Sequence, residues 1–443
     1  MAHPTKIIVL DDDPTGSQTV HSCLLLTCWD VPTLTMGLAD SSPIMFILTN
    51  TRALPADQAE SVTKEACQNL KIALLDQPNV PDFLVVSRSD STLRGHYPIE
   101  TDAIATALGP FDAHFLVPAF LEGGRITRDS IHYLKIDGKL TPVHETEFAQ
   151  DSVFAYHHSY LPDYVAEKTQ GRIPADRVEQ FLLKDIRQGI QPRLAQLQGN
   201  ICGVVDAETQ GDLDRFAEDV LAVAATGKRF LFRSAASLLT ALAQLPPQPI
   251  PAESMGQYRR SSHPGVIVVG SHVQKTTEQL TCLLGDSGVV GIELAVAELV
   301  DNGDAAPELI QDSLGQITRV FEAGQTPVLF TSRQELQFAD TTTRLAFGLK
   351  VSEVLMAIVR ELPPQISFLI SKGGITSNDV LSTGLNLPTA RLLGQILPGC
   401  SVVRTGLDHP RFPELPVVLF PGNVGDRQGL LTVYKRLMAC DLA

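Results

Sequence analysis

The sequence predicts an α/β protein of two domains, each a largely parallel sheet flanked by helices, with a ligand cleft between them. Short apolar segments alternate with amphipathic helical patterns through the first half of the chain. Residues 245–264 are rich in proline, lack periodicity and resemble an interdomain linker. A second alternating series follows them. These observations predict a first domain over residues 1–244, a linker over 245–264 and a second domain over 265–443.

The first domain is predicted from continuous apolar runs, which are typical of strands buried on both faces of a parallel sheet. Strands are expected at Ile7–Leu10, Ile44–Leu48, Phe83–Val86, Phe115–Val117, Ile201–Val205 and Phe230–Phe232, with helices over 57–75, 97–108 and 211–226. Residues 121–175 break this rhythm. They contain a hairpin pattern around an Asp137-Gly138 turn and are interpreted as an insertion or lid.

The second domain is predicted by the same alternation. Strands are expected over 265–270, 289–294, 327–331, 366–371, 400–404 and 416–420, and helices over 275–284, 304–323, 342–361, 376–384 and 426–439. No repeat relates the two halves. The order of the elements therefore favours two α/β domains of unequal size.

Composition limits the classes of partner. The 443 residues carry a formal net charge of −15, which argues against a nucleic-acid or anionic-membrane surface. No apolar run is long enough to cross a bilayer. The seven cysteines form neither a CxxC pair nor a regular framework, which fits reduced thiols in a cytoplasmic protein. We expect no structural zinc and a small-molecule partner, and a homo-oligomer stays open.

Three adjacent acids follow the first predicted strand, in the sequence Asp11-Asp12-Asp13-Pro14-Thr15-Gly16. Adjacent carboxylates repel one another and lose solvation when they are buried, so a fold tolerates them where cations, hydroxyls or water share the charge. The alternative is a solvated loop of an acidic protein. The turn is therefore a candidate site at the end of a strand.

Two arginines and several hydroxyl groups follow the Phe83–Val86 strand, within Ser87–Gly95. Arginine offers a bidentate fork to a carboxylate, and Asp90 and Ser89 are suited to hydroxyl groups. This composition indicates a site for a polyhydroxy carboxylate, although a capped loop is the structural alternative. A further cluster at Pro118–Thr127 adds Arg125 on a glycine turn.

A glycine pair follows the strand near 366–371, in Ser371-Lys372-Gly373-Gly374-Ile375-Thr376. Paired glycines let backbone N–H groups approach an anion, and the helix that follows supplies unpaired donors. A purely structural turn is the alternative. The chain has no Walker A motif, and neither domain begins with the GxGxxG turn of a dinucleotide site.

These segments together resemble the four-carbon acid sugar kinases. The resemblance rests on Asp12–Gly16, Ser87–Gly95, Pro118–Arg125, Gly270-Ser271, Gly373–Ser377 and Phe420–Asn423, and it covers nearly the whole chain in the right order. It implies an ATP-dependent kinase with a sugar-acid domain followed by a nucleotide domain. Family substrates are threonate, erythronate and 3-oxo-tetronate, which are phosphorylated at the terminal hydroxyl. The chain departs from the family pattern at Asp11, Pro14 and Ile375, which leaves the substrate open.

The resemblance and the residue chemistry assign roles as follows. Asp12 or Asp13 is expected to be the general base, with Mg²⁺ contacted through water and no protein metal site. Substrate contacts are expected from Arg52, Ser89, Asp90, Arg94, Gly95 and Arg125. Arg94 is expected to hold the substrate carboxylate, with help from Arg88 or Arg52. Nucleotide contacts are expected from Ser271, Lys372, Gly373, Gly374, Ile375, Thr376 and Gly422.

Two other functions stay open at this point. An NAD-dependent oxidoreductase of a hydroxy acid would also use glycines at strand ends, but it would need a dinucleotide turn. A non-catalytic sensor of sugar acids or nucleotides would keep the arginines without needing the base.

Overall fold

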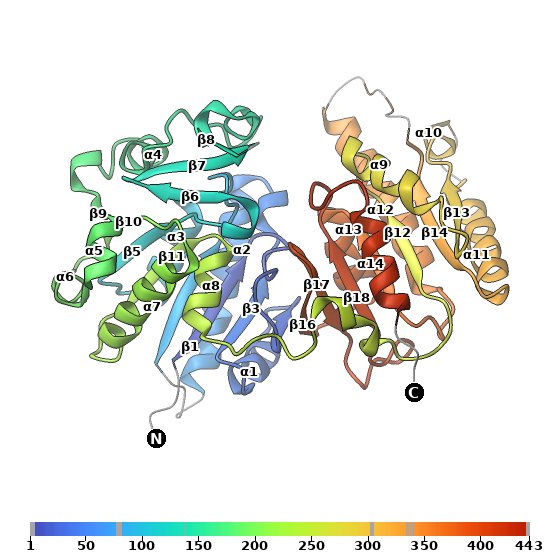
Figure 1. Ribbon diagram of the computed structural model, residues 1–443, viewed down its shortest axis with the longest axis horizontal. Helices are drawn as coiled ribbons and strands as arrows, with labels where there is room; N and C mark the ends of the chain where they lie inside the picture. Colours follow the sequence, from blue (N-terminus) through green and yellow to red (C-terminus); the bar gives the residue numbers. More distant parts are fainter. Residues whose placement is uncertain are drawn as a thin grey trace. The chain divides into compact units, whose positions relative to one another are not determined.

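The computed structural model describes residues 5–76, 82–136, 138–301, 305–333, 336, 338 and 341–439. The chain divides into two compact units, Met1–Pro246 and Pro247–Ala443. Figure 1 draws the first unit in blue to green and the second in yellow to red. Each unit is an α/β sheet with helices against it, which confirms the prediction of two α/β domains with largely parallel sheets.

The sheet of the first unit is parallel throughout its strand pairs. Its strand order is β2-β3-β1-β4-β11-β5-β10-β9. The strands are β1 (Lys6–Asp11), β2 (Cys23–Leu26), β3 (Ile44–Leu48), β4 (Phe83–Arg88), β5 (Ala113–Val117), β9 (Glu179–Phe181), β10 (Ile201–Val205) and β11 (Phe230–Ser234). Because β1, β4 and β11 run side by side, the residues after them meet at one edge of the sheet.

Helices cover both faces of this sheet. On one face, Leu34, Leu70 and Ile104 from α1 (Val31–Ala39), α2 (Ala56–Leu75) and α3 (Ile99–Leu108) pack with the strands. On the other face, Phe216 of α7 (Gln210–Ala224) packs edge-on against Phe115. A capping box between Thr209 and Asp212 starts α7. The remaining helices are α5 (Leu183–Gln188), α6 (Gln191–Gln196) and α8 (Ala236–Ala243).

The stretch interpreted as an insertion forms a separate antiparallel sheet in the order β6-β7-β8 (Figure 1). Its strands are β6 (Arg125–Arg128), β7 (Ile131–Ile136) and β8 (Lys139–Pro142). The β7–β8 pair is a hairpin at the expected place, and Asp137 of its turn lies outside the described residues. Two 3₁₀ turns, Val143–Glu145 and Glu147–Gln150, and helix α4 (Leu161–Lys168) complete the insertion.

The sheet of the second unit has the order β13-β14-β12-β15-β18-β17-β16. The pairs from β13 to β18 are parallel, whereas β17 pairs antiparallel with both β18 and β16. The strands are β12 (Val266–Val269), β13 (Val289–Leu294), β14 (Thr326–Thr331), β15 (Leu369–Lys372), β16 (Thr389–Leu397), β17 (Cys400–Arg404) and β18 (Pro416–Phe420). The sequence analysis had no strand at β16.

Helices α9 (Gln274–Leu283) and α14 (Gly429–Met438) pack against β12 and β15 in one apolar cluster. The 3₁₀ helix Ala252–Tyr258 joins them, since Met255 is fully buried in the same cluster. Helices α10 (Glu298–Asp301), α11 (Ala306–Glu322), α12 (Thr341–Arg360) and α13 (Gly374–Asp379) complete the unit, and a short π-helix, Val380–Gly384, continues α13. Part of the proline-rich segment therefore packs as a component of the second unit.

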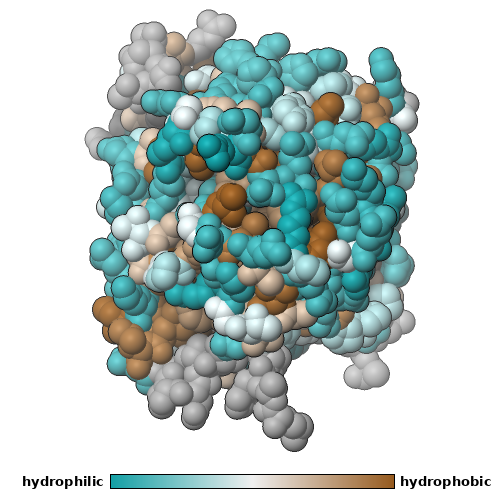
Figure 2. Space-filling view, turned by 90° about the vertical axis from the view of Figure 1, so that its left-hand side faces the viewer, coloured by the Kyte–Doolittle hydropathy of each residue, from teal (hydrophilic) through white to brown (hydrophobic). Residues whose placement is uncertain are grey.

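The face in Figure 2 is mostly hydrophilic, with separate hydrophobic patches. Within the described ranges, every helix is too short or too polar to serve as a membrane span.

Candidate active site

The acidic turn lies at the end of β1, and arginines at the ends of neighbouring strands lie close to it. The side chains of Asp11 and Asp12 are buried, while that of Asp13 is 21% exposed. Gly16 packs directly against the carboxylate of Asp11, because a Cβ at this position would overlap its oxygens. The turn is therefore a packed element and not a solvated loop.

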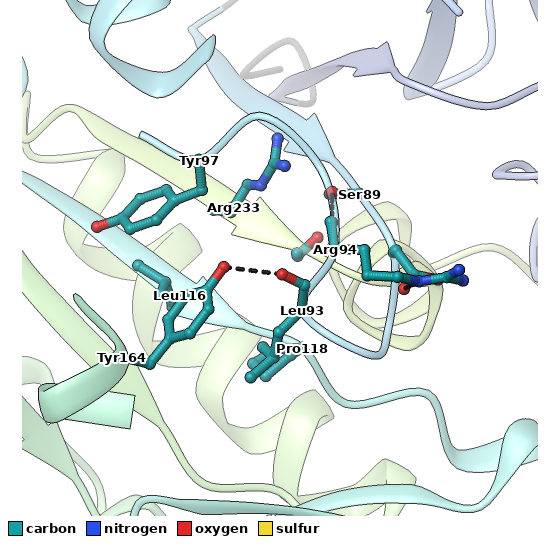
Figure 3. A pocket seen from close by; sticks show the side chains of 10 residues that line it. Ser89, Leu93, Arg94, Tyr97, Leu116, Pro118, Tyr164 and Arg233 are labelled. Carbon is teal, nitrogen blue, oxygen red and sulfur yellow. Dashed lines mark hydrogen bonds and ion pairs between the residues drawn. The ribbon is translucent and has the colours of Figure 1, made fainter. Parts of the chain in front are cut away.

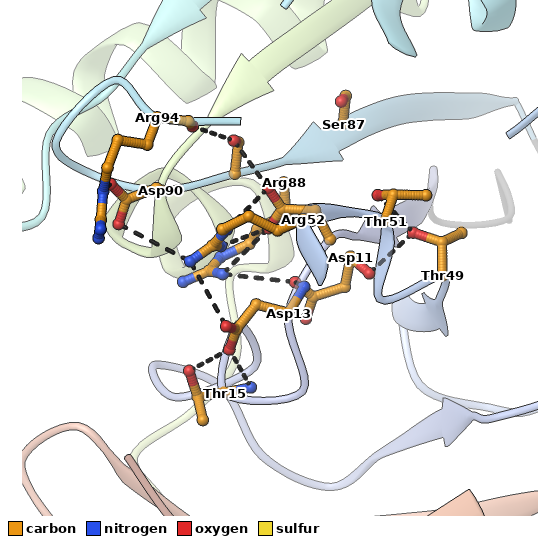
Figure 4. A network of polar contacts seen from close by, with 12 residues as sticks. Asp11, Asp13, Thr15, Thr49, Thr51, Arg52, Ser87, Arg88, Asp90 and Arg94 are labelled. Carbon is orange, nitrogen blue, oxygen red and sulfur yellow. Dashed lines mark hydrogen bonds and ion pairs between the residues drawn. The ribbon is translucent and has the colours of Figure 1, made fainter. Parts of the chain in front are cut away.

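Arg52 joins the acids of two strand ends (Figure 4). Its guanidinium binds both oxygens of Asp12, with Nε 3.2 Å from Oδ2. Its Nη1 lies 3.4 Å from Asp13 Oδ2 and 3.8 Å from Asp90 Oδ1. The backbone N–H of Arg52 also donates to the carbonyl oxygen of Asp12, at 3.2 Å. One planar cation thus bridges three carboxylates, which is the geometry that arginine favours.

The acids of the site differ in charge state. Burial raises the pKa of Asp11 to about 8, although Arg88 at 3.5 Å opposes this shift, so Asp11 is protonated at neutral pH. Burial also acts to raise the pKa of Asp13, but the charges of Arg52 and Arg88 outweigh it and hold that pKa below the ordinary value. The pKa of Asp90 is lowered in the same way, by Arg52 and Arg94 against burial. Asp13 and Asp90 are therefore anions.

The loop after β4 contributes Ser89, Asp90 and Arg94. Ser89 Oγ donates to Asp12 Oδ2 at 2.9 Å, which ties this loop to the acidic turn. Asp90 Oδ2 accepts from the Arg94 Nε–H at 2.9 Å and from Thr92. Gly95 has a φ of +113°, and a Cβ there would lie 2.6 Å from Ser89 Oγ. The position consequently requires glycine.

The insertion holds this loop through its backbone. His132 Nε2 lies 2.8 Å from the carbonyl oxygen of Ser91. The hydroxyls of Tyr156 and Tyr164 donate to the next two carbonyl oxygens, of Thr92 at 2.7 Å and Leu93 at 2.8 Å. Three successive carbonyls of the loop are thus bonded by side chains of one insertion, which fixes the path that Arg94 follows.

Arg94 belongs to this loop, and Arg125 is the first residue of β6 in the insertion. Arg94 Nη1 lies 3.5 Å from Asp151 Oδ2, and its guanidinium stacks on Phe148 at 5.0 Å. Arg125 donates to the carbonyl oxygen of Gly123, and its Nε is buried without a partner in the described part of the chain. Burial lowers the pKa of Arg125, and the negative charge of Asp90 opposes this. Arg125 is thus near Asp90, but among the described residues it has no ion-pair partner.

Sequence reasoning missed Arg233, which lies next to the last residue of β11. It lines a cavity of about 20 Å³ together with Ser89, Asp90 and Arg94 (Figure 3). The available signal was a strand, Phe230–Ser234, that ends in a cation and a hydroxyl, as β4 does. Only the strand order, with β11 beside β4, brings Arg233 to the predicted residues.

The predicted nucleotide residues gather at the ends of β12, β15 and β18. Gly373 has a φ of +127° and precedes α13, while its N–H donates to Phe420 O at 2.8 Å. A Cβ on Gly373 would lie 3.1 Å from Ser271 Cβ, and one on Gly422 would lie 2.9 Å from Ser271 Oγ. Both glycines pack too closely against Ser271 to admit a side chain.

Thr276 and Thr376 secure these turns. Thr276 Oγ1 donates to Gly422 O at 2.9 Å and lies at hydrogen-bond distance, 3.2 Å, from Ser271 Oγ. Thr376 is buried beneath Gly270, where a Cβ would overlap its hydroxyl. Ser271, Thr376 and Gly422 therefore come together as expected.

The other predicted residues of this turn differ in their exposure. Lys372 is fully buried, and its ammonium donates to the carbonyl oxygens of Pro421 at 2.5 Å and Gly422 at 3.2 Å. Burial lowers the pKa of Lys372 to about 7. Its side chain holds the 421–422 turn. Gly374 is the first residue of α13, and Ile375 is 70% exposed.

The predicted residues thus form two groups, one in each unit. Within the described residues, no three or more His, Cys, Asp or Glu side chains are arranged to hold a metal ion. In the first group, the carboxylates of Asp12, Asp13 and Asp90 lie among several arginines. The chemistry of the second is that of a glycine turn at a sheet edge.

Comparison with protein families finds two adjoining matches. Residues 7–242 match the model described as sugar-binding N-terminal domain, and residues 266–430 match the nucleotide-binding C-terminal domain. Among characterised proteins, the chain is 24% identical over 459 residues to a D-erythronate kinase of Heliobacterium modesticaldum, covering 98% of this chain and 97% of that one. It is 27% identical to a D-threonate kinase of Salmonella typhimurium, covering 95% of each.

Two solved structures share the fold. One, from Salmonella typhimurium LT2 and named as a tRNA synthase, aligns with a TM-score of 0.71 and 20% identity over 97% of this chain and 98% of that one. The other, a Haemophilus influenzae protein, gives a TM-score of 0.65 with 18% identity over 96% and 98%. At this identity, the likeness establishes the two-domain fold.

Proposed function

The chain belongs to the four-carbon acid sugar kinase family, and we propose that it transfers the γ-phosphoryl group of ATP to a terminal hydroxyl of a four-carbon sugar acid. The observation that carries this proposal is the bridge of Arg52 between Asp12, Asp13 and Asp90. The bridge connects Asp13, whose carboxylate can accept a proton, to the loop after β4. That loop carries Arg94, a cation that can bind an acid substrate. The relatives named as D-erythronate and D-threonate kinases support the same substrate class.

The carboxylate of the substrate is assigned to Arg125 and Arg94. Arg125 has no acid partner in the described residues, and its buried Nε is free to donate. Arg94 is shared between Asp90 and Asp151. A substrate carboxylate would supply the acceptor that Arg125 lacks, and charge-assisted hydrogen bonds of this kind are strong.

Asp13 is the better placed of the two candidate bases. Asp12 is 2% exposed, and both of its oxygens are bound by Arg52, with Ser89 on one of them. Asp13 is 21% exposed, and among the described residues its Oδ2 has one polar contact, the longer one to Arg52 at 3.4 Å. The attacking oxygen forms its bond to the γ-phosphorus while the bond to the ADP oxygen breaks, and the hydroxyl proton passes to Asp13. Because the transition state is loose, positioning matters more than basicity, so the lowered pKa of Asp13 is compatible with this role.

The turn at Gly373, Ser271 and Gly422 is assigned to the phosphates of ATP. Gly373 and Gly422 pack against Ser271 without room for a side chain, and glycine backbone is the kind that a ligand can approach closely. Mg²⁺, if it accompanies ATP, would neutralise phosphate charge, and the exposed carboxylate of Asp13 is a ligand type that Mg²⁺ contacts through water. Lys372 would act indirectly, by holding the 421–422 turn in place.

The test is an ATP-consumption assay of the native chain with D-threonate, D-erythronate, 3-oxo-tetronate and sugar acids of neighbouring length. We expect ATP-dependent formation of a monophosphate ester from a four-carbon acid, identified by mass spectrometry and located by NMR at the terminal carbon. Phosphorylation of none of the acids would contradict the proposal. Reduction of NAD with one of them would favour the oxidoreductase instead.

A further inference from the structure

Arg233 is a buried cation that the roles assigned above do not use. Its side chain is 7% exposed. Nη1 donates to Glu100 Oε2 at 2.6 Å and to Ser87 Oγ at 2.7 Å. Glu100 is itself held by a hydrogen bond of 2.6 Å from Thr51 Oγ1. The guanidinium is therefore fixed in position and its charge is balanced by a neighbouring carboxylate.

The second terminal nitrogen of this guanidinium has no acceptor. Nη2 of Arg233 is buried and has no hydrogen-bond partner in the described part of the chain. It lies against Gly95, where a Cβ would be 2.7 Å away. Buried guanidinium N–H groups are almost always paired in native proteins, and each exception calls for an explanation. Here the free donor faces the same region as the predicted substrate residues.

The space at Arg233 is small. The cavity that it lines has a volume of about 20 Å³, enough for a water molecule or one oxygen of a ligand. Ser89, Asp90 and Arg94 line the same cavity. The position is thus next to Arg94. It is also close to Asp12, since a Cβ on Gly95 would lie 2.7 Å from Arg233 Nη2 and 3.1 Å from Asp12 Oδ2.

Charge decides what kind of oxygen fits. The Arg233 charge is already matched by Glu100, so a second carboxylate would have no uncompensated cation at this point. A neutral hydroxyl or keto oxygen accepts from Nη2 without adding charge. In a four-carbon acid, one end is the carboxylate and the other carries the reacting hydroxyl. The neutral oxygens that remain are those on the two interior carbons.

We propose that Nη2 of Arg233 donates to the oxygen on one interior carbon of the sugar acid, and that Arg233 thereby helps to select the substrate. This inference rests on the proposed function and identifies the substrate oxygen that Arg233 contacts. Acids that differ at an interior carbon, by configuration or by loss of a hydroxyl, would differ in their contact with Arg233. A site that must pair a buried donor discriminates strongly against a ligand without the acceptor.

The experiment compares kcat/KM of the native chain and of Arg233→Lys on three acids: the preferred four-carbon acid and its analogues lacking the oxygen at C2 or at C3. Arg233→Lys keeps a cation beside Glu100 and removes Nη2. In the native chain, loss of the oxygen that accepts the hydrogen bond from Arg233 should lower kcat/KM about tenfold to a hundredfold, as for a hydrogen bond to a charged group. In Arg233→Lys, the same loss should have little further effect, because the donor is already gone.

Arg187→Lys is the matched control, since Arg187 pairs with Asp212 away from the site. It should leave the pattern across the three acids unchanged. If Arg233→Lys is poorly folded by its melting curve, the double variant Arg233→Gln with Glu100→Gln removes both charges together, and the same comparison applies.

Each result decides the matter. If the effects of Arg233→Lys and of oxygen removal multiply independently for both analogues, Arg233 does not contact an interior oxygen and the inference is wrong. If the native chain phosphorylates none of the acids, the proposed function itself fails, and this inference with it.

Discussion

The hydroxyl of Tyr164 donates a 2.8 Å hydrogen bond to the carbonyl oxygen of Leu93. Leu93 has a φ of +67°, a conformation that a leucine rarely adopts. Burial raises the pKa of Tyr164, so its hydroxyl keeps the proton that it donates. The insertion therefore stabilises a turn that the loop sequence alone would not favour, immediately before Arg94.

Replacement of Tyr164 by Phe should loosen this loop. The carbonyl oxygen of Leu93 loses its donor, and the expected loss of stability is about 1–3 kcal/mol. KM for the sugar acid should rise several-fold while KM for ATP stays unchanged, because the loop belongs to the first unit. Tyr160→Phe is the control, since Tyr160 donates to Gln180 and not to the loop. An equal rise of KM for both substrates would contradict a local role.

The buried acid Asp11 should make stability depend on pH. Its pKa is about 8 in the folded protein and near 3.8 when unfolded, so between these values the folded state binds one more proton. Stability conferred by the neutral acid is therefore lost as pH rises from about 4 to about 8. Relative to Asp11→Asn, the native chain should lose up to about 1.4 kcal/mol per pH unit in this window. Urea unfolding of both proteins across the window measures the difference, and a difference that is constant with pH would refute a neutral Asp11.

Substitution of Gly373 by Ala should impair nucleotide binding selectively. The φ of +127° is strained for alanine, and the new Cβ would contact Ser271 and Thr376 at about the closest distances tolerated. We expect a large loss of ATP affinity in calorimetry with the affinity for sugar acid retained. Gly315→Ala in α11 is the control, because a Cβ there meets nothing within 4 Å. Unchanged ATP binding by Gly373→Ala would place the phosphates elsewhere.

The sequence was sufficient for most strands because buried parallel strands are continuous apolar runs with polar ends. It was insufficient for β2 and β16. Residues Cys23–Leu26 are a short run close to the acidic turn, and β16 is antiparallel and interrupted by a register shift at Gly394. Both segments lack the long uninterrupted apolar run by which the other strands were predicted, and β16 is recognised only through its antiparallel pairing with β17.

The residues of the site also divide into those that the sequence could predict and those that it could not. Arg52, Ser89, Asp90 and Arg94 could be predicted because each lies next to a strand end in the sequence. Arg233 could not, because its place depends on β11 lying between β4 and β5. Nor does the glycine pair reveal which member needs conformational freedom: the positive φ falls on Gly373, while Gly374 opens the helix.

The measurement that tests the account most directly is the turnover of Asp13→Asn at saturating ATP and sugar acid. The amide keeps the size of the side chain and removes the proton acceptor, so kcat should fall about a hundredfold to ten-thousandfold with the melting temperature nearly unchanged. Asp11→Asn, which replaces a neutral acid by a neutral amide, should keep turnover close to native. Asp13→Asn with nearly full turnover would contradict the assignment of Asp13 as the base, and a loss confined to Asp12→Asn would transfer that role to Asp12.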